Sequence, residues 1–291
     1  MKDISSFPDF IGQVGAATVY QFLAIFGFIL LFGLLLYFIS RSTRNAFMNS
    51  DHGKLDIYLT GWVGTPVHEI GHAIFCLIFG HRIIGISLYN PNSVDGTLGY
   101  VNHSYNPESL YQRIGFFFIG AGPILFGSFV LYILMYFCLP NYREVSEMIS
   151  NTNLTGTDVF DLIKSIKDIL SFGLNLTASI FVIGNLGNLS FWVFIYLSFC
   201  ISSHMQLSPP DLKSMWTGLF TILFIFLLVN FTTLLLGFNV TTYILNLSRF
   251  LGTMIGIFIL ALFISLINFS ITYIILSIIH YKKYRRLLSI F

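Results

Sequence analysis

The chain carries very little charge for its length. Only 10% of its 291 residues are Asp, Glu, Lys or Arg, whereas ordinary soluble domains carry about 25%. Hydrophobic residues make up 55% of the chain and aromatic residues 17%. This composition excludes an ordinary soluble domain and predicts a polytopic membrane protein.

Cysteines and basic clusters are also scarce. Cys76, Cys138 and Cys200 all lie in apolar stretches, and their spacing matches neither a disulfide framework nor a metal-binding set. We interpret them as small buried side chains. No basic run is interleaved with aromatic residues, so the sequence indicates no nucleic-acid partner, and no motif indicates a soluble cofactor.

Long apolar windows are abundant. About six of them reach the roughly 20 residues that a helix needs to cross a bilayer. They are Val14–Ser40, Leu55–Phe79, Ile114–Leu139, Leu174–Ser202, Leu212–Leu236 and Tyr243–His280. We therefore expect an all-α polytopic fold with about six transmembrane helices, in which residues 1–291 form one integral membrane domain. The expected location is the cell membrane of a prokaryote.

Two segments between the windows have a different pattern. Short strand-like runs at Ile83–Tyr89 and Thr97–His103 flank a turn-rich centre, which predicts a small membrane-associated β-hairpin at about 83–103. The segment 141–172 is the only long polar connection. Apolar residues in its second half recur at helical spacing, which favours an interfacial amphipathic helix at about 157–172.

The basic residues give conflicting signals about orientation. The basic tail at 282–286 favours a cytoplasmic C-terminus, because positive residues concentrate on the cytoplasmic side. With six spans, the loop that holds Arg41, Arg44 and Lys54 would then face outward, against the same rule. The sequence leaves the orientation open.

The most informative motif is His68-Glu69-Ile70-Gly71-His72, inside the second apolar window. Residues four apart share one face of a helix, so His68 and His72 can offer two imidazoles to one metal ion. Glu69 lies near enough to act as general base on a water at that ion. Ionisable groups are costly within a membrane and are usually functional there. The motif predicts a Zn²⁺-dependent hydrolase.

A zinc hydrolase usually needs a third protein ligand. Asp211 is a candidate because Ser208-Pro209-Pro210 precedes it and breaks the helix between two apolar windows. Left unpaired at mid-membrane it would cost about 2.5–3.5 kcal/mol. The same position also suits a residue that caps a helix N-terminus. His204 is the alternative third ligand, and it could instead stabilise an oxyanion or simply lie at the membrane interface.

Other polar or small residues in the windows allow two interpretations. Gly120-Ala121-Gly122-Pro123 permits close helix approach and interrupts the helical hydrogen bonds, which favours either packing or a cleft beside the metal. Asn185 and Asn188 are candidate substrate-binding residues, as is His204. Hydrogen bonds between helices explain the two asparagines equally well.

Taken together, the His68–His72 motif, Gly120–Pro123 and the proline-flanked Asp211 resemble the site-2 protease family of intramembrane zinc metalloproteases. The resemblance covers roughly residues 61–215. Family members usually have an Asn-rich, Pro-containing approach to a Leu-Asp-Gly signature. Here the approach reads Ser202-Ser203-His204-Met205 and the signature reads Pro210-Asp211-Leu212.

This resemblance implies that His68, His72 and Asp211 are zinc ligands and that Glu69 is the general base, within a catalytic core at about 55–236. It also implies a substrate that is a transmembrane helix of another protein. Such a helix must unwind before cleavage, and a strand of the hairpin could pair with the unwound segment. The alternatives are a membrane transporter for metal ions and a non-catalytic relative that binds transmembrane helices.

Overall fold

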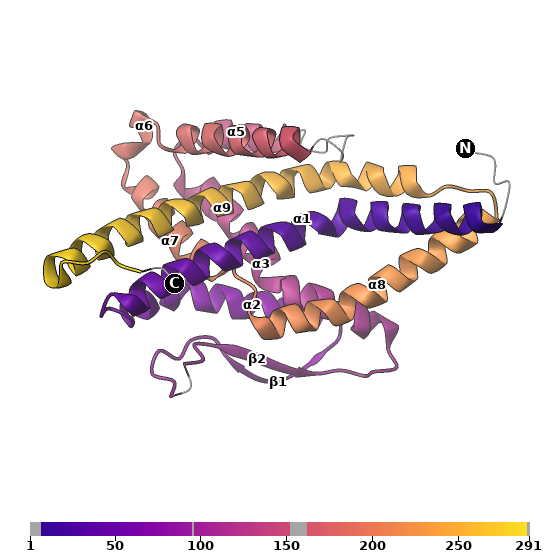
Figure 1. Ribbon diagram of the computed structural model, residues 1–291, viewed down its shortest axis with the longest axis horizontal. Coiled ribbons are helices and arrows are strands. Elements are labelled where there is room, and N and C mark those ends of the chain that lie inside the picture. Colours follow the sequence, from indigo (N-terminus) through magenta and orange to yellow (C-terminus); the bar gives the residue numbers. More distant parts are fainter. Residues whose placement is uncertain (1–6, 95, 152–161, 290–291) are drawn as a thin grey trace.

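The computed structural model describes residues 7–94, 96–151 and 162–289, and these form a mainly helical bundle with one two-stranded sheet (Figure 1). The helices are α1 (Phe7–Asn49), α2 (Trp62–Ile78), α3 (Leu110–Cys138), α4 (Tyr142–Ser150), α5 (Leu162–Ile180), α6 (Ile183–Leu186), α7 (Leu189–His204), α8 (Pro209–Leu235) and α9 (Thr241–Tyr284). A π-helical turn, η1 (Ile57–Gly61), leads directly into α2.

Four of the described helices are long and apolar enough to cross a membrane: α1, α3, α8 and the Gly252–Tyr284 part of α9. Helix α7 is apolar but shorter. The expected all-α class is therefore confirmed, with four helices suited to crossing a membrane among the described residues, whereas six spans are not confirmed. The two remaining windows differ from a simple spanning helix for separate reasons.

The second window is helical, but the π turn η1 divides it. Only the 17 residues of α2 follow as regular α-helix, with Pro66 inside them. A π turn widens the helix and changes its hydrogen-bond pattern. The Ile57 and Leu59 carbonyls accept hydrogen bonds from the hydroxyls of Tyr89 and Tyr196, at 2.9 and 2.8 Å. The start of α2 is thus fixed to the hairpin side and to α7.

The fourth window, Leu174–Ser202, is not one helix. Helix α5 ends at Ile180, the backbone of Val182 is extended, and α7 begins only at Leu189. Gly184, Gly187 and Asn188 lie in this break, and glycine and asparagine are weak helix formers. Propensity at these positions therefore outweighs the hydrophobicity of the window.

The expected amphipathic helix at 157–172 needs a related correction. Its residues up to 161 lie outside the described part of the chain. From Leu162 the helix exists as α5, but it continues to Ile180 instead of ending at 172. Leu176 and Ile180 are buried there in a cluster with residues of α7 and α9, and this packing extends the helix beyond its polar part.

Helices α1, α8 and α9 form a long frame (Figure 1). Helix α9 runs parallel to α1, because Gln21 contacts Thr241 near their first ends and Asp51 contacts Lys283 at 2.9 Å near their last ends. Helix α8 runs the opposite way, and Asn230 exchanges two amide hydrogen bonds with Gln21, at 2.8 and 2.9 Å. The buried Gln21–Asn230 pair, the part-buried Gln21–Thr241 contact and the exposed Asp51–Lys283 ion pair together link the three helices.

The centre of the bundle is apolar. One cluster of buried side chains joins five helices through residues such as Phe26, Phe117, Ile201, Leu219 and Phe258. Helix α3 lies between α2 and α8 and packs closely against both. This central position of α3 brings the two halves of the candidate site together.

The expected β-hairpin is confirmed. Strands β1 (Arg82–Ser87) and β2 (Tyr100–Ser104) pair antiparallel, with Ile83 opposite His103 and Ser87 opposite Tyr100. Figure 1 shows the hairpin on one side of the bundle, near α2 and α8, and α5 on the opposite side. The hairpin is therefore in position to cover the histidine motif.

Candidate metal centre

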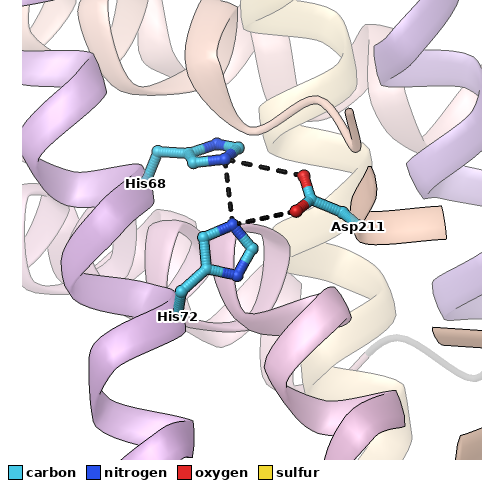
Figure 2. A group of neighbouring side chains, drawn as sticks. All are labelled: His68, His72 and Asp211. Atoms are coloured by element: carbon cyan, nitrogen blue, oxygen red, sulfur yellow. Dashed lines mark hydrogen bonds and ion pairs between the residues drawn. The ribbon is translucent and has the colours of Figure 1, made fainter. Parts of the chain in front are cut away.

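Three side chains from two helices meet at one point. His68 and His72 lie one turn apart on α2, and Asp211 faces them from the first turn of α8 (Figure 2). Their ligand atoms all lie within 4.8 Å of one another. The two imidazole Nε2 atoms are 3.1 Å apart, and the Asp211 carboxylate oxygens lie 3.2 Å from His72 and 3.7 Å from His68. The sequence-predicted set is thus brought together.

Asp211 also caps a helix. Its carboxylate accepts a hydrogen bond from the Ser208 backbone N–H at 2.8 Å, and its own N–H donates to the Ser208 hydroxyl at 3.4 Å. This reciprocal capping box satisfies backbone donors that are left free at the start of α8. The sequence left two roles open for Asp211: it could cap α8, or it could face the histidines as a ligand. In the structure one carboxylate does both, and the cap fixes its orientation.

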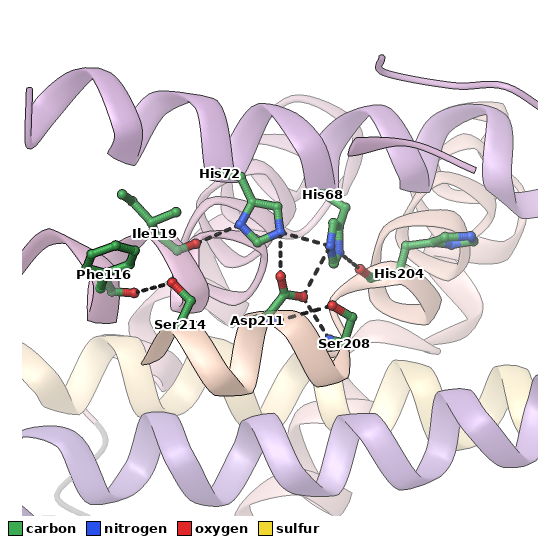
Figure 3. A network of polar contacts seen from close by, with 8 residues as sticks. All are labelled: His68, His72, Phe116, Ile119, His204, Ser208, Asp211 and Ser214. Carbon is green, nitrogen blue, oxygen red and sulfur yellow. Dashed lines mark hydrogen bonds and ion pairs between the residues drawn. The ribbon is translucent and has the colours of Figure 1, made fainter. Parts of the chain in front are cut away.

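Backbone carbonyls determine the tautomer of both histidines. His72 Nδ1 lies 2.7 Å from the Ile119 carbonyl oxygen, and His68 Nδ1 lies 2.7 Å from that of His204 (Figure 3). A carbonyl only accepts hydrogen bonds, so each Nδ1 must be the protonated donor. In a neutral imidazole the Nε2 atom then carries the lone pair. Both lone pairs consequently face the third side chain, as in histidines that ligate metals.

Glu69 lies beside this group and is nearly buried, with 6% of its surface exposed. It lines a cavity of about 470 Å³ together with His68 and His72. Gly99, which precedes β2, lies directly against its side chain. A Cβ atom on Gly99 would be 2.9 Å from a Glu69 carboxylate oxygen. A glycine at this position therefore leaves the carboxylate room to face the cavity.

The hairpin forms one wall of the cavity, and α3 and α8 complete it. The wall residues outside the histidine motif are Thr97, Gly99, Tyr100, Val101, Asn102, His103, Ile119, Gly120, Ser208, Pro210, Asp211 and Ser214. Burial, together with the neighbouring His81, lowers the pKa of His103 to about 4. His103 is therefore neutral near pH 7 and adds no positive charge that would repel a cation.

Glycines in α3 explain why the two helices can converge. A Cβ atom on Gly122 would lie 2.7 Å from the Gly71 carbonyl oxygen, within the histidine motif. A Cβ atom on Gly120 would lie 2.6 Å from the Asp211 carbonyl oxygen. These contacts are with backbone atoms, which cannot swing away. The Gly120–Pro123 motif thus packs against α2 on one side and α8 on the other, and Gly120 also lines the cavity, so the motif serves both packing and the cleft.

We expect Gly122→Ala to separate α2 from α3 and to weaken metal binding. Overfilling a close contact typically costs about 1–3 kcal/mol. The measurements are zinc affinity and thermal unfolding in detergent. Gly15→Ala is the matched control, because no atom lies within 4 Å of its added methyl group. Equal zinc affinity and stability in the two variants would contradict this role of Gly122.

The remaining predicted residues lie elsewhere. The His204 imidazole points away from Asp211 and contacts the Cys200 carbonyl, and only its backbone carbonyl reaches His68 (Figure 3). Asn185 donates to the Ile180 carbonyl and to Asn141, and Asn188 donates to the Gly184 carbonyl. Neither asparagine is among the residues that line the cavity. Their hydrogen bonds stabilise the break between α5 and α7.

Three contributors were not foreseen from sequence. The carbonyls of Ile119 and His204 act through backbone atoms, so the side chains of these two residues carry no signal. Gly99 lies within the predicted hairpin and looks like an ordinary strand glycine. A glycine inside a strand often marks a close approach of another group, and that signal could have identified it.

Comparisons with known proteins add no further identification. No protein-family model, curated protein or solved structure matches this chain. The functional interpretation therefore rests on the motifs and on the geometry of the site.

Proposed function

We propose that the protein is a zinc-dependent intramembrane endopeptidase, as the resemblance to site-2 proteases implies. The observation that carries this proposal is the convergence of two imidazole lone pairs and a carboxylate beside Glu69. A single proton on one Nε2 could form only one hydrogen bond within this group, whereas a metal ion satisfies all three ligands. Such a donor set is typical of catalytic zinc sites.

The spacing of the ligand atoms fits zinc. Two ligands at about 2.1 Å from a tetrahedral zinc ion lie about 3.4 Å from each other. Here the two Nε2 atoms are 3.1 Å apart, His72 Nε2 lies 3.2 Å from one Asp211 oxygen, and His68 Nε2 lies 3.7 Å from the other. With one ligand atom taken from each residue, all three atoms lie within 4.8 Å of one another, which is compact enough for one ion. His68, His72 and Asp211 would hold the ion and leave one coordination position open, as a hydrolase requires.

A zinc ion and Glu69 would have separate roles in the hydrolysis. A bound zinc ion would lower the pKa of a water molecule and polarise the scissile carbonyl. Glu69 accepts the proton of the attacking water and then delivers it to the leaving amine. Glu69 follows His68 on α2 and lines the same cavity as both histidines, so its carboxylate stays near the reacting atoms through both steps. The hairpin covers one side of the site and reduces its contact with bulk water, which strengthens these electrostatic interactions.

The apolar surroundings and the hairpin support the substrate class that the resemblance implies, a transmembrane helix of another protein. Among the described residues, β2 is paired along one edge only, by β1, and residues of β2 line the cavity. An unwound segment of a transmembrane helix would add to the free edge as a further strand. Ile84 and Ile86 are exposed on β1, which supports contact of the hairpin with lipid.

The same proposal includes a multi-pass location in the cell membrane of a prokaryote. The Asp51–Lys283 contact joins the last ends of α1 and α9. Arg41, Arg44 and the basic tail at 282–286 therefore lie toward the same end of the bundle, and the conflict seen in the sequence disappears. Because positive residues favour the cytoplasm, this end faces the cytoplasm.

The direct test is cleavage of a reporter with one transmembrane helix by the purified protein in liposomes. The reporter helix contains an Asn-Pro pair, since proline weakens helical hydrogen bonds. We expect cleavage that stops when a chelator removes the metal and returns with added Zn²⁺. Reporter binding without cleavage would favour the non-catalytic alternative. Zinc entry into the liposomes without cleavage would favour the transporter. Cleavage unaffected by complete metal removal would refute the zinc mechanism.

A further inference from the structure

The acceptor that orients His72 is a carbonyl without its usual helical donor. In an α-helix each backbone N–H donates to the carbonyl four residues earlier. The residue four positions after Ile119 is Pro123, which has no N–H. Both residues lie within α3 and are buried. The Ile119 carbonyl thus faces the interior with its helical hydrogen bond missing.

The His72 imidazole supplies the missing donor. Its Nδ1 lies 2.7 Å from the Ile119 oxygen. A buried carbonyl strongly favours a donor, so this contact holds His72 in the tautomer that is protonated at Nδ1. The Nε2 lone pair is thereby directed to Asp211 and His68 (Figure 3). The same helix that brings α2 and α8 together also provides this acceptor.

We propose that Pro123 is a positioning residue for the metal centre, which acts by leaving the Ile119 carbonyl free for His72. This inference rests on the proposed function, because it assigns His72 to a metal ion. It adds a role for Pro123, which would set the tautomer of the ligand His72 without touching the ion itself.

His68 also donates to a carbonyl that lacks its usual helical donor, but here the donor is missing because a helix ends. His68 Nδ1 donates to the carbonyl of His204, the last residue of α7. The N–H four residues later belongs to Ser208, and it donates to the Asp211 carboxylate instead. A helix end therefore frees the acceptor for His68, as a proline frees the acceptor for His72. His68, His72 and Asp211 are thus each oriented by a backbone group that has no partner within its own helix.

The test distinguishes the effect of the missing proline N–H from the effect of the proline ring. One variant is Pro123→Ala, which restores a backbone N–H that competes with His72 for the Ile119 carbonyl. The other carries lactic acid at position 123, which has the methyl side chain of alanine but replaces the N–H with an ester oxygen. Pro66→Ala is the matched control, because Pro66 is also inside a helix. Thermal unfolding in detergent verifies that each variant is folded.

The first readout is zinc affinity, measured by competition with a chelator. A carbonyl has two lone pairs, so alanine weakens the His72 contact without abolishing it. We expect about a 10-fold loss of affinity, at the lower end of the range for partners that orient ligands. The lactic acid variant and the Pro66→Ala variant should bind zinc like the parent protein. Equal affinity of the alanine and lactic acid variants would overturn the proposal.

The second readout needs no metal. Nitrogen-15 NMR of the metal-free protein distinguishes the two tautomers of His72. We expect the tautomer protonated at Nδ1 in the parent protein and in the lactic acid variant, and a mixture in Pro123→Ala. A parent protein that binds no zinc would refute the proposed function. An unchanged tautomer in Pro123→Ala would refute this inference alone.

Discussion

Replacing Glu69 with glutamine is expected to reduce reporter cleavage by about 10²- to 10⁴-fold, the usual contribution of a positioned general base. Glutamine has nearly the same shape, but its amide cannot accept the proton of the attacking water. Zinc content should stay at about one ion per chain, because the three ligands remain in place. Cleavage and zinc content are measured on the same purified sample.

The matched control for this variant is Glu108→Gln. Glu108 is an exposed carboxylate before α3 and does not line the cavity. Its replacement should leave both cleavage and zinc content unchanged. A Glu69→Gln protein that cleaves the reporter at the parental rate would remove Glu69 from the mechanism, whatever the state of the metal.

Replacing Asp211 with asparagine is expected to lower zinc affinity by more than about 100-fold, beyond the range seen for outer partners. The asparagine amide oxygen can still accept the hydrogen bond from the Ser208 N–H, so α8 should begin at the same residue. The loss therefore reports on the carboxylate as a ligand and not on the helix start. Zinc affinity is measured by chelator competition, and circular dichroism checks the helix content.

His204→Gln provides the opposite expectation. The imidazole of His204 points away from the group, and only its backbone carbonyl orients His68. Because a side-chain replacement keeps this carbonyl, zinc affinity should remain close to that of the parent protein. If His204→Gln lost zinc while Asp211→Asn retained it, the third ligand would be His204.

The features that the sequence predicts well are those encoded locally. Short strand-like runs on both sides of a turn-rich centre specify the hairpin over a few residues. The i, i+4 spacing of His68 and His72 fixes their shared face wherever the helix lies. Asp211 could be identified because a proline-containing break rarely presents an acid in an apolar region without a partner.

The features that the sequence predicts poorly depend on contacts between distant segments. The break after Ile180 in the Leu174–Ser202 window is an exception with a local cause, because Gly184, Gly187 and Asn188 favour it but hydropathy does not register them. The Gly122 contact with Gly71 and the Ile119 contact with His72 join different helices through backbone atoms. Residue type does not specify such partners, so the arrangement of α2, α3 and α8 required the structure.

The central claim is that two histidines and one aspartate hold a zinc ion, and X-ray absorption at the zinc edge tests it most directly. The zinc-loaded protein should show two imidazole nitrogens at about 2.0–2.1 Å and a carboxylate oxygen at about 2.0–2.2 Å. A variant with alanine in place of both His68 and His72 should lose the ion. A zinc shell that contains sulfur, or an unchanged spectrum in that double variant, would contradict the account.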